Sequence, residues 1–316
     1  MDERIKLGVS ACLVGQEVRF DGGHKRDRFI TDILNQYADY VPVCPEVEYG
    51  LGIPRESLRL VGDPASPMLV TTKTHVDHTD GMLRYARKRV AELEKEDLCG
   101  FIFKSRSPSS GMERVKVYNE KGIPENKGVG IFARVFMEHF PLVPVEEEGR
   151  LHDPKLRENF IESIFTLKRW REAIVGTSRL KTLVDFHTRH KLLVMSHSPK
   201  HYRSMGNLVG TGKQYPLSEL FSMYESLLME AMKLKATIKK NINVLQHIMG
   251  YFKKQLSKDE KQEILEILDN YRNGDVPLIV PITLMNHHVR KYEEAYLGRQ
   301  FYLKPHPIEL HLRNHA

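Results

Sequence analysis

Cysteine and long hydrophobic runs are scarce in this chain of 316 residues, and each scarcity excludes a class of protein. Three cysteines cannot make the disulfide framework that holds small secreted domains together. No run of about 18 uncharged apolar residues occurs, so we expect no membrane-spanning helix and no membrane partner. The chain also opens without an apolar signal segment, and we therefore expect a cytoplasmic protein.

Low-complexity tracts and internal repeats are absent as well. Hydrophobic residues make up 41% of the chain and charged residues 28%, which is ordinary for a globular protein with a packed core. A disordered protein is excluded by the same numbers. The length is too great for one average domain and suits two.

Positive charge is concentrated in the second half. Residues 1–150 carry 22 Lys and Arg against 24 Asp and Glu, whereas residues 151–316 carry 26 against 17. A near-neutral half joined to a basic half favours a polyanionic partner for the second half, most often nucleic acid. A solvated basic surface without a partner explains the charge equally well.

In the first half, apolar strand-like runs alternate with helical stretches. Strands are predicted at 6–12, 39–44, 68–72 and 100–104, and helices at 77–96 and 131–139. This alternation predicts an α/β, Rossmann-like domain with a mostly parallel sheet. The acidic stretch Glu146–Glu148 resembles a boundary, so we divide the chain into domains at 1–149 and 150–316.

In the second half, the spacing of apolar residues is typical of helices throughout. Helices are predicted from Pro154 through Trp170, after Thr177-Ser178, within 217–249 as one long helix or two, from Ser257 to Tyr271 and from Thr283 to Tyr296. Ser257 and Glu260 have the spacing of a capping box. The tail at 301–307 is expected to be extended. The sequence therefore predicts an all-α second domain.

Three predicted strands of the first domain end in turn-rich segments. These follow Cys12, Cys44 and Lys104. Ligands of doubly wound sheets bind beyond the carboxyl ends of the strands, so these segments are expected to converge on one crevice.

Two of these segments carry residues suited to chemistry. Cys44-Pro45-Glu46 sets a metal-binding thiol beside a carboxylate that can move protons. The loop Ser105–Gly111 offers hydroxyls and backbone N–H groups to an anion or a polar substrate. A buried cysteine before a turn and a plain surface loop are the alternatives.

The second half carries two candidate RNA-binding groups. One is a helical group around 187–191 and the other is a lysine-rich stretch with interleaved aromatic residues; either can instead be a solvated helix face. The His-x-x-His spacing of the first group lacks the glutamate of a protease-type zinc site. The predicted RNA-binding residues are His187, Arg189, His190, Lys191, Lys239, Lys240, Lys253 and Lys254.

Four motifs in the first half resemble those of the thiouracil desulfidase family. They are Val9-Ser-Ala-Cys-Leu13, Val18-Arg-Phe-Asp-Gly22, Cys44-Pro-Glu46 and Lys104-Ser-Arg-Ser-Pro-Ser-Ser-Gly111. The second half is similar to the domain of unknown function 1722, on Phe186–Lys191, Asn243–His247, Gly250–Lys254 and Pro277–Pro281. Chains that join the two resemble bacterial desulfidases that act on 4-thiouridine in tRNA.

The resemblance implies a non-redox hydrolysis at a [4Fe–4S] cluster held by three cysteines, whose open iron takes the sulfur of the base. By motif position Cys12 and Cys44 would be cluster ligands and Glu46 the acid/base. Ser107 and Ser109 would hold the substrate or its leaving sulfur. tRNA is the implied partner, and no obligate protein partner is expected.

One position departs from the family pattern. The family loop reads Ser-Pro-Ser-Cys-Gly, and its cysteine is the third cluster ligand; here Ser110 stands at that position. Cys99 is a poor substitute ligand without rearrangement, because a five-residue strand of about 16 Å separates Cys99 from the loop. The chain is then a ligand variant of an active desulfidase, or a tRNA-binding protein with a vestigial crevice. A desulfidase of free thiolated nucleobases is the third alternative.

Overall fold

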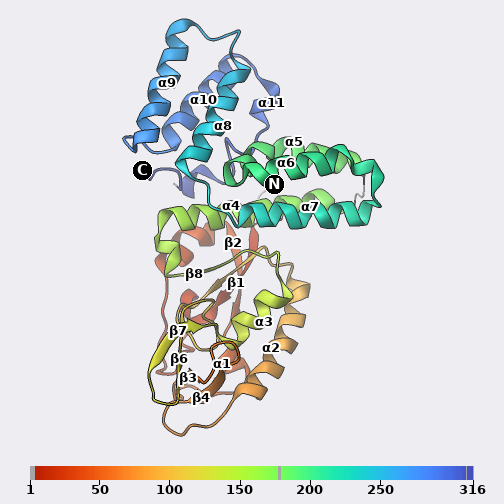
Figure 1. Ribbon diagram of the computed structural model, residues 1–316. Coiled ribbons are helices and arrows are strands. Elements are labelled where there is room, and N and C mark those ends of the chain that lie inside the picture. The colour runs from red at the N-terminus through yellow and green to blue at the C-terminus, as the bar shows by residue number, and fades with distance from the viewer. Residues whose placement is uncertain (1–3, 177–178, 311, 316) are drawn as a thin grey trace. The chain divides into compact units, whose positions relative to one another are not determined.

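The computed structural model describes residues 4–176, 179–310 and 312–315 (Figure 1). The chain divides into two compact units, Met1–Asp153 and Pro154–Ala316. Thr177 and Ser178, expected ahead of a helix, lie outside the described residues, as do residues 1–3. In the described ranges no helix is both long and apolar enough to cross a membrane.

A four-stranded parallel sheet, sheet A, forms the centre of the first unit. Its strand order is β2 (Ala38–Val43), β1 (Ile5–Ser10), β5 (Gly100–Phe103) and β8 (Val145–Glu147). All four residues of β5 are buried, and aromatic rings of β5 and α3 (Ile131–His139) pack together. The α/β, mostly parallel fold predicted for the first half is thus confirmed.

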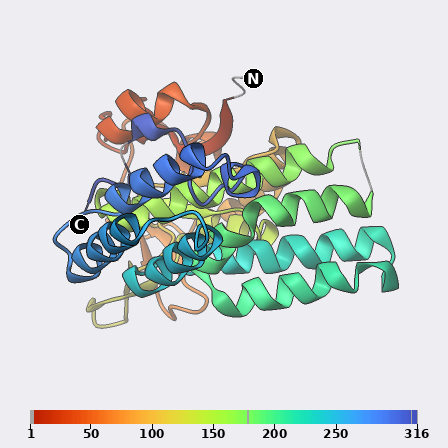
Figure 2. The same ribbon diagram turned by 90° about the horizontal axis from the view of Figure 1, so that it is seen from above.

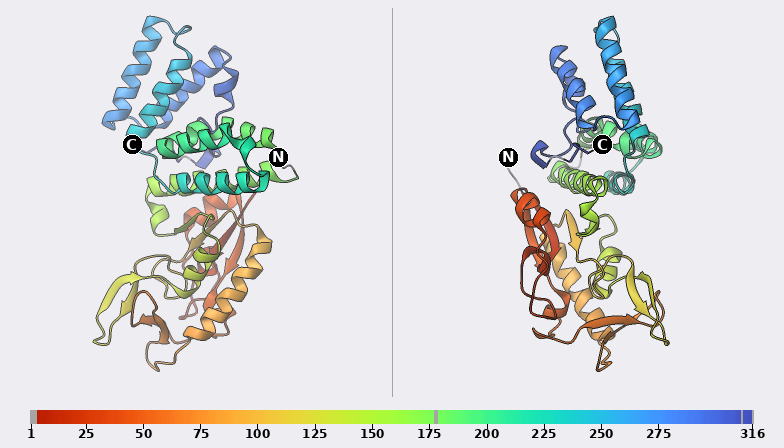
Figure 3. Two further views of the ribbon diagram at one scale, coloured as in Figure 1. Left: turned by 45° about the vertical axis from the view of Figure 1, so that its right-hand side comes forward. Right: turned by 90° about the vertical axis from the view of Figure 1, so that its left-hand side faces the viewer.

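A second, mixed sheet, sheet B, was not foreseen. Its order is β4 (Met68–Thr71), β3 (Leu58–Val61), β6 (Val115–Tyr118) and β7 (Pro124–Gly128). The pairs β3–β4 and β6–β7 are antiparallel, and β3–β6 is parallel. The predicted strand at 68–72 therefore belongs to sheet B. Short α1 (Pro45–Glu48) and long α2 (Thr79–Leu93) complete the unit, and α2 lies beside α3 (Figure 3).

The acidic stretch at 146–148, which resembles a boundary in the sequence, belongs to the first unit: β8 pairs with β5, and Glu146, Glu147 and Glu148 are all buried. Partners elsewhere in the fold neutralise this charge, since Arg150 pairs with Glu146 and Lys104 with Glu148.

The second unit is all-helical, which confirms the prediction for that half. The helices are α4 (Pro154–Ile174), α5 (Leu180–His197), α6 (Pro199–Gly210), α7 (Leu217–Met232), α8 (Ile238–Tyr251), α9 (Lys258–Asn273), α10 (Ile279–Lys291) and α11 (Ala295–Gly298). Figure 2 shows α4 to α7 running alongside one another, and α8, α9 and α10 pack together as a second group.

Three details of the helical prediction are settled by the structure. The segment 217–249 forms two helices, because Thr237 begins α8 by accepting a hydrogen bond from the Lys240 N–H. The capping box of Ser257 and Glu260 is confirmed. The last long helix begins earlier than predicted, at Ile279, because a proline in the first turn removes no intrahelical hydrogen bond.

The prediction of an extended tail at 301–307 is wrong. The tail forms turns in which the N–H groups of Leu303 and Lys304 donate to the carbonyls of Gln300 and Phe301. The buried guanidinium of Arg169 binds the Pro305 carbonyl at 2.7 Å, which fixes the tail to α4.

Candidate active site

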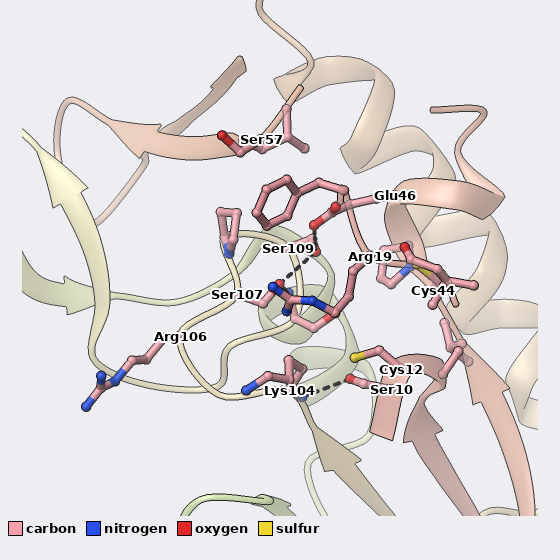
Figure 4. Close-up of a pocket in the computed structure, with 18 of the residues that line it drawn as sticks. Ser10, Cys12, Arg19, Cys44, Glu46, Ser57, Lys104, Arg106, Ser107 and Ser109 are labelled. Atoms are coloured by element: carbon pink, nitrogen blue, oxygen red, sulfur yellow. Dashed lines mark hydrogen bonds between the residues drawn. The ribbon is translucent and has the colours of Figure 1, made fainter. Parts of the chain in front are cut away.

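The three segments that follow β1, β2 and β5 line one pocket at the carboxyl edge of sheet A (Figure 4). The pocket has a volume of about 210 Å³. Its lining residues include Cys12, Cys44, Glu46, Ser107, Ser109 and Ser110, the predicted catalytic and metal-binding residues. The parallel strands therefore bring together residues that are about 100 positions apart in the sequence.

Two thiols face this pocket from neighbouring strand ends. Cys12 lies in a 3-10 turn directly after β1, and Cys44 is the N-cap of α1, whose first residue is Pro45. Burial raises the pKa of Cys12 to about 11, against the opposing charge of Lys104, and burial also raises the pKa of Cys44. Both thiols are therefore protonated near neutral pH, and a metal that binds them must displace those protons.

Glu46 is held from two sides. Its Oε2 accepts a hydrogen bond of 3.0 Å from Arg55 Nε, and its Oε1 accepts one of 2.8 Å from Ser109 Oγ. The Arg55 side chain is 7% exposed, and it also donates to the Val18 carbonyl at 3.0 Å. The carboxylate is thus oriented into the pocket. Nothing in the sequence marked Arg55 as part of the site.

The hydroxyls of the loop form a directed chain that ends at Glu46. Ser109 uses its single hydroxyl proton on Glu46, so Ser107 must donate in the 3.0 Å contact between the two hydroxyls. Ser107 Oγ in turn accepts the Ser110 N–H at 3.1 Å. The chain fixes the hydroxyl protons and connects the middle of the loop to the carboxylate.

Helix α3 holds this loop in place. Its N-terminal N–H groups, those of Phe132 and Ala133, donate to the Ser109 carbonyl at 2.9 and 3.2 Å. The loop carbonyl thereby satisfies donors that a helix start leaves open. Gly130 allows this approach, because a Cβ there would come within 2.6 Å of Ser109 backbone atoms.

Glu148 holds the start of the loop, and the sequence analysis missed this role. Its carboxylate accepts hydrogen bonds from the Ser105 N–H at 2.7 Å and the Ser105 hydroxyl at 2.7 Å, and it pairs with Lys104 Nζ. The Lys104 N–H also donates to Ser10 Oγ at 2.8 Å, which ties the end of β5 to the end of β1. In the sequence Glu148 belongs to the acidic run that resembles a domain boundary, so nothing there marks it as a residue of the site.

The pocket contains two sulfur donors and one oxygen donor that could bind an iron centre. Cys12 and Cys44 supply thiols, and Ser110, 4% exposed, supplies a hydroxyl at the third position. Across the ranges 4–176, 179–310 and 312–315, no three His, Cys, Asp or Glu side chains gather as a metal site. Cys99 precedes β5, at the opposite end of that strand from the loop. The donor set fits a thiophilic metal group with one hard ligand.

Two of the predicted RNA-binding residues lie in the interior of the second unit. His190 is 1% exposed, its ring stacks between Phe186 and Phe301, and Arg169 Nε lies 3.0 Å from its Nε2. His187 contacts Tyr224 Oη, and burial lowers the pKa of His187 to about 4. Both rings are neutral near pH 7, so we assign them to the core and propose no phosphate contact for them.

The other predicted RNA-binding residues lie at or near the surface. Lys239, Lys253, Lys254 and Arg189 are exposed, and the Arg189 guanidinium lies 4.7 Å from the centre of the Phe301 ring. Lys191 is half-buried over the Tyr296 ring. Lys240 donates to the His197 and Lys235 carbonyls at 2.6 and 2.8 Å, so it caps the end of α5. Lys239, Lys253 and Lys254 are thus exposed cations, whereas Arg189 and Lys191 contact aromatic rings and Lys240 binds main-chain carbonyls.

Two family models match the chain, one in each unit. Residues 7–148 match the model described as 2-thiouracil desulfurase, and residues 191–307 match a protein of unknown function, DUF1722. The uncharacterized protein YbgA of Escherichia coli K12 is 31% identical over 133 residues, which are 42% of this chain and 79% of YbgA. The uncharacterized protein YbbK of Bacillus subtilis 168 is 30% identical over 108 residues, 33% of this chain and 71% of YbbK.

Among solved structures, one described as the [4Fe-4S]-dependent thiouracil desulfidase TudS is 28% identical. The match covers 48% of this chain and 95% of that one, with a TM-score of 0.39. The two family models match in the order that the motifs predicted, and the curated relatives are matched over most of their length. The chain therefore belongs to the 2-thiouracil desulfurase family and carries a DUF1722 domain behind its desulfurase domain.

Proposed function

We propose that this chain is a C–S-cleaving enzyme that converts 4-thiouridine in tRNA to uridine by hydrolysis. The observation that carries the proposal is the pocket in which two thiols face a carboxylate connected to a chain of serine hydroxyls. Water supplies the oxygen of the new carbonyl and sulfur leaves as hydrosulfide, so the reaction needs neither oxidant nor reductant.

The residues of the pocket divide the work of this reaction. Glu46 accepts the proton of the attacking water, and Arg55 keeps its carboxylate oriented. Ser107 and Ser109 hold the base or its leaving sulfur as hydrogen-bond acceptors, because both hydroxyl protons are directed along the chain to Glu46. Phe20, which lines the pocket and is exposed, supplies an aromatic side chain for stacking on the pyrimidine.

A [4Fe–4S] cluster fits this pocket, with Cys12 and Cys44 as sulfur ligands and Ser110 as the third ligand. Such a cluster supplies a thiophilic Lewis acid for the sulfur of the substrate. Ser110 is the harder and less acidic ligand, so we expect the cluster to be more labile than one held by three thiolates.

The charge of the second unit supports tRNA as the substrate. Residues 151–316 carry nine more basic than acidic side chains, and Lys239, Lys253 and Lys254 are exposed there. Basic side chains with neighbouring aromatic rings, such as Tyr251, are typical of surfaces that bind RNA.

The test compares the natural chain with its Ser110→Cys variant after anaerobic cluster reconstitution. Iron and acid-labile sulfide per chain and the loss of 4-thiouridine from tRNA are measured. We expect both proteins to bind a cluster and desulfurate tRNA, the variant with the higher iron content. Ser66→Cys, an exposed position outside the pocket, controls for an added thiol.

Ser110 also favours a second candidate function, a tRNA-binding protein with an inactive pocket. Cluster and desulfuration in Ser110→Cys alone would establish that candidate and overturn the proposal for the natural chain. Absence of a cluster in both proteins would overturn the iron–sulfur assignment. Turnover of free thiouracil with no reaction on tRNA would identify a desulfidase of free bases.

A further inference from the structure

Hydrogen-bond acceptors dominate the wall of the pocket that the serine loop and Glu46 form. Ser109 gives its hydroxyl proton to Glu46, and Ser107 gives its own to Ser109, so both hydroxyls meet a ligand only as acceptors. A uracil ring presents an N–H group at N3 and, directly beside it, a carbonyl oxygen at C2. The serine hydroxyls suit the N–H group, whereas the C2 oxygen requires a donor.

Two of the cations that line the pocket already have partners in the protein. Lys104 Nζ donates to the Ser105 carbonyl at 3.2 Å and to the Ser105 hydroxyl at 3.0 Å, and it pairs with Glu148. These contacts use its three protons. Arg55 Nε and Nη2 bind the Glu46 carboxylate. Both cations are therefore held by acceptors of the fold itself.

Arg19 retains donors that the fold does not use. Its side chain lines the pocket and is 22% exposed, and Figure 4 shows its guanidinium pointing into the pocket, whereas that of Arg106 points away. Asp21 approaches Arg19 Nε to 3.3 Å and Nη2 to 3.4 Å. A guanidinium has five N–H groups, so these two contacts leave three without a hydrogen bond in the described part of the chain.

The main chain on both sides of Arg19 is held by Arg55. The Arg55 side chain donates to the Val18 carbonyl at 3.0 Å, and its backbone N–H donates to the Phe20 carbonyl at 2.9 Å. The residue that orients Glu46 thus also fixes the segment from which the Arg19 side chain enters the pocket. The carboxylate and the guanidinium therefore have a common support.

We propose that Arg19 donates a hydrogen bond to the C2 carbonyl oxygen of the pyrimidine and thereby restricts the pocket to 2-oxo pyrimidines. The inference rests on the proposed function, which puts a 4-thiolated pyrimidine in the pocket. The N3–H group of that ring donates to the hydroxyl oxygen of Ser107 or Ser109, and the C2 oxygen accepts from Arg19. A ring without this oxygen leaves the guanidinium without an acceptor, which weakens its binding.

Binding of bases to the metal-free, full-length chain tests the proposal without turnover. Uracil and pyrimidin-4-one, which lacks the C2 oxygen, are titrated calorimetrically into the natural chain and into Arg19→Met and Arg19→Lys. The two rings also differ in protonation at N1, so the ratio of their affinities is compared between proteins, in which that difference cancels. The matched control is Arg28→Met, which removes an exposed cation that does not line the pocket.

We expect the natural chain to bind uracil roughly 10- to 100-fold more tightly than pyrimidin-4-one, because the lost hydrogen bond comes from a charged donor. Arg19→Met should lower this ratio by the same factor by weakening the binding of uracil alone. Arg19→Lys keeps a cationic donor and should keep part of the ratio, and Arg28→Met should keep all of it. A purely structural role of Arg19 would weaken the binding of both bases equally and leave the ratio unchanged.

Equal affinity of the natural chain for the two bases, binding of neither, or a ratio unchanged in Arg19→Met would overturn the proposal. Loss of 4-thiouridine from tRNA, measured with the reconstituted natural chain, tests the proposed function separately. Desulfuration with a ratio that does not depend on Arg19 would overturn only the role of Arg19. A ratio that depends on Arg19 in a chain that does not desulfurate tRNA would overturn only the proposed function.

Discussion

The carboxylate of Glu46 lies between a buried guanidinium and a chain of two serine hydroxyls. Each of its neighbours donates a hydrogen bond to it, so the group is positioned as a proton acceptor. At the scale of single residues this arrangement, more than the thiols, distinguishes the pocket from a plain metal site.

Glu46→Gln should therefore separate chemistry from cluster binding. We expect iron content and tRNA affinity to stay as in the natural chain, and turnover to fall roughly 10²- to 10⁴-fold, because the amide cannot accept a proton from water. Single-turnover loss of 4-thiouridine measures the effect. Glu138→Gln, on the exposed side of α3, is the control. Normal turnover in Glu46→Gln would remove the carboxylate from the mechanism.

The buried thiol of Cys12 gives a prediction about pH. Its pKa is about 11 in the folded chain against an ordinary value of 9.0, so the folded chain keeps a proton that the unfolded chain releases. The stability that this thiol contributes is complete below pH 9 and is lost as the pH rises toward 11. Alkylation of Cys12 by iodoacetamide should have its midpoint near pH 11 in the metal-free folded chain and near 9 in urea. Equal midpoints would contradict the burial effect.

At the scale of elements, the long and strongly patterned segments could be predicted from the sequence. β1, β2, β5, α2, α3 and the long helices of the second unit follow from apolar periodicity, and the carboxyl ends of the strands fix where a ligand can bind. The convergence of Cys12, Cys44 and Glu46 follows from that topology, because parallel strands end at one edge.

Other elements depend on partners that a local pattern does not contain. β7 is exposed over most of its length, and it is a strand only because β6 pairs with it. The glutamates around β8 are buried because Lys104 and Arg150 meet them. His190 has the spacing of a surface histidine, but Phe186, Phe301 and Arg169 enclose its ring. Arg55 likewise acquires its role only through the tertiary contact with Glu46.

The junction between α3 and the serine loop depends on the absence of a side chain at Gly130. Gly130→Ala would place a Cβ within 2.6 Å of Ser109 and 2.8 Å of Ser110 backbone atoms, which cannot yield as a flexible side chain can. We expect a loss of about 1–3 kcal/mol in the free energy of unfolding, together with reduced turnover. Urea unfolding measures the first effect.

The matched control for this variant is Gly250→Ala in α8. Nothing lies within 4 Å of the Cβ that it would add, so an alanine should be neutral or stabilising by up to about 1 kcal/mol. Equal stability of the two variants would show that α3 does not hold the loop through this contact.

At the scale of the whole molecule, charge is divided between the two units. The desulfurase unit is close to neutral and the helical unit is strongly basic. Lys240 has to be set apart from the other lysines, because its ammonium group binds main-chain carbonyls.

The triple variant Lys239→Gln/Lys253→Gln/Lys254→Gln should weaken tRNA binding about equally for all tRNAs. The slope of log K against log salt should fall by roughly 1 for each phosphate that the variant no longer neutralises. Turnover of free thiouracil should be unaffected. The same three positions changed to arginine keep the charge and should keep the affinity, as measured by filter binding at several salt concentrations. Unchanged affinity in the glutamine variant would exclude this surface.

The position of β8 has a consequence for producing the desulfurase unit alone. β8 covers β5, whose four residues are all buried. A fragment that stopped at the acidic run would leave β5 as an uncovered apolar edge strand, and such strands pair with other copies and aggregate. A soluble fragment must therefore extend through the glutamates to Asp153, where the compact unit ends.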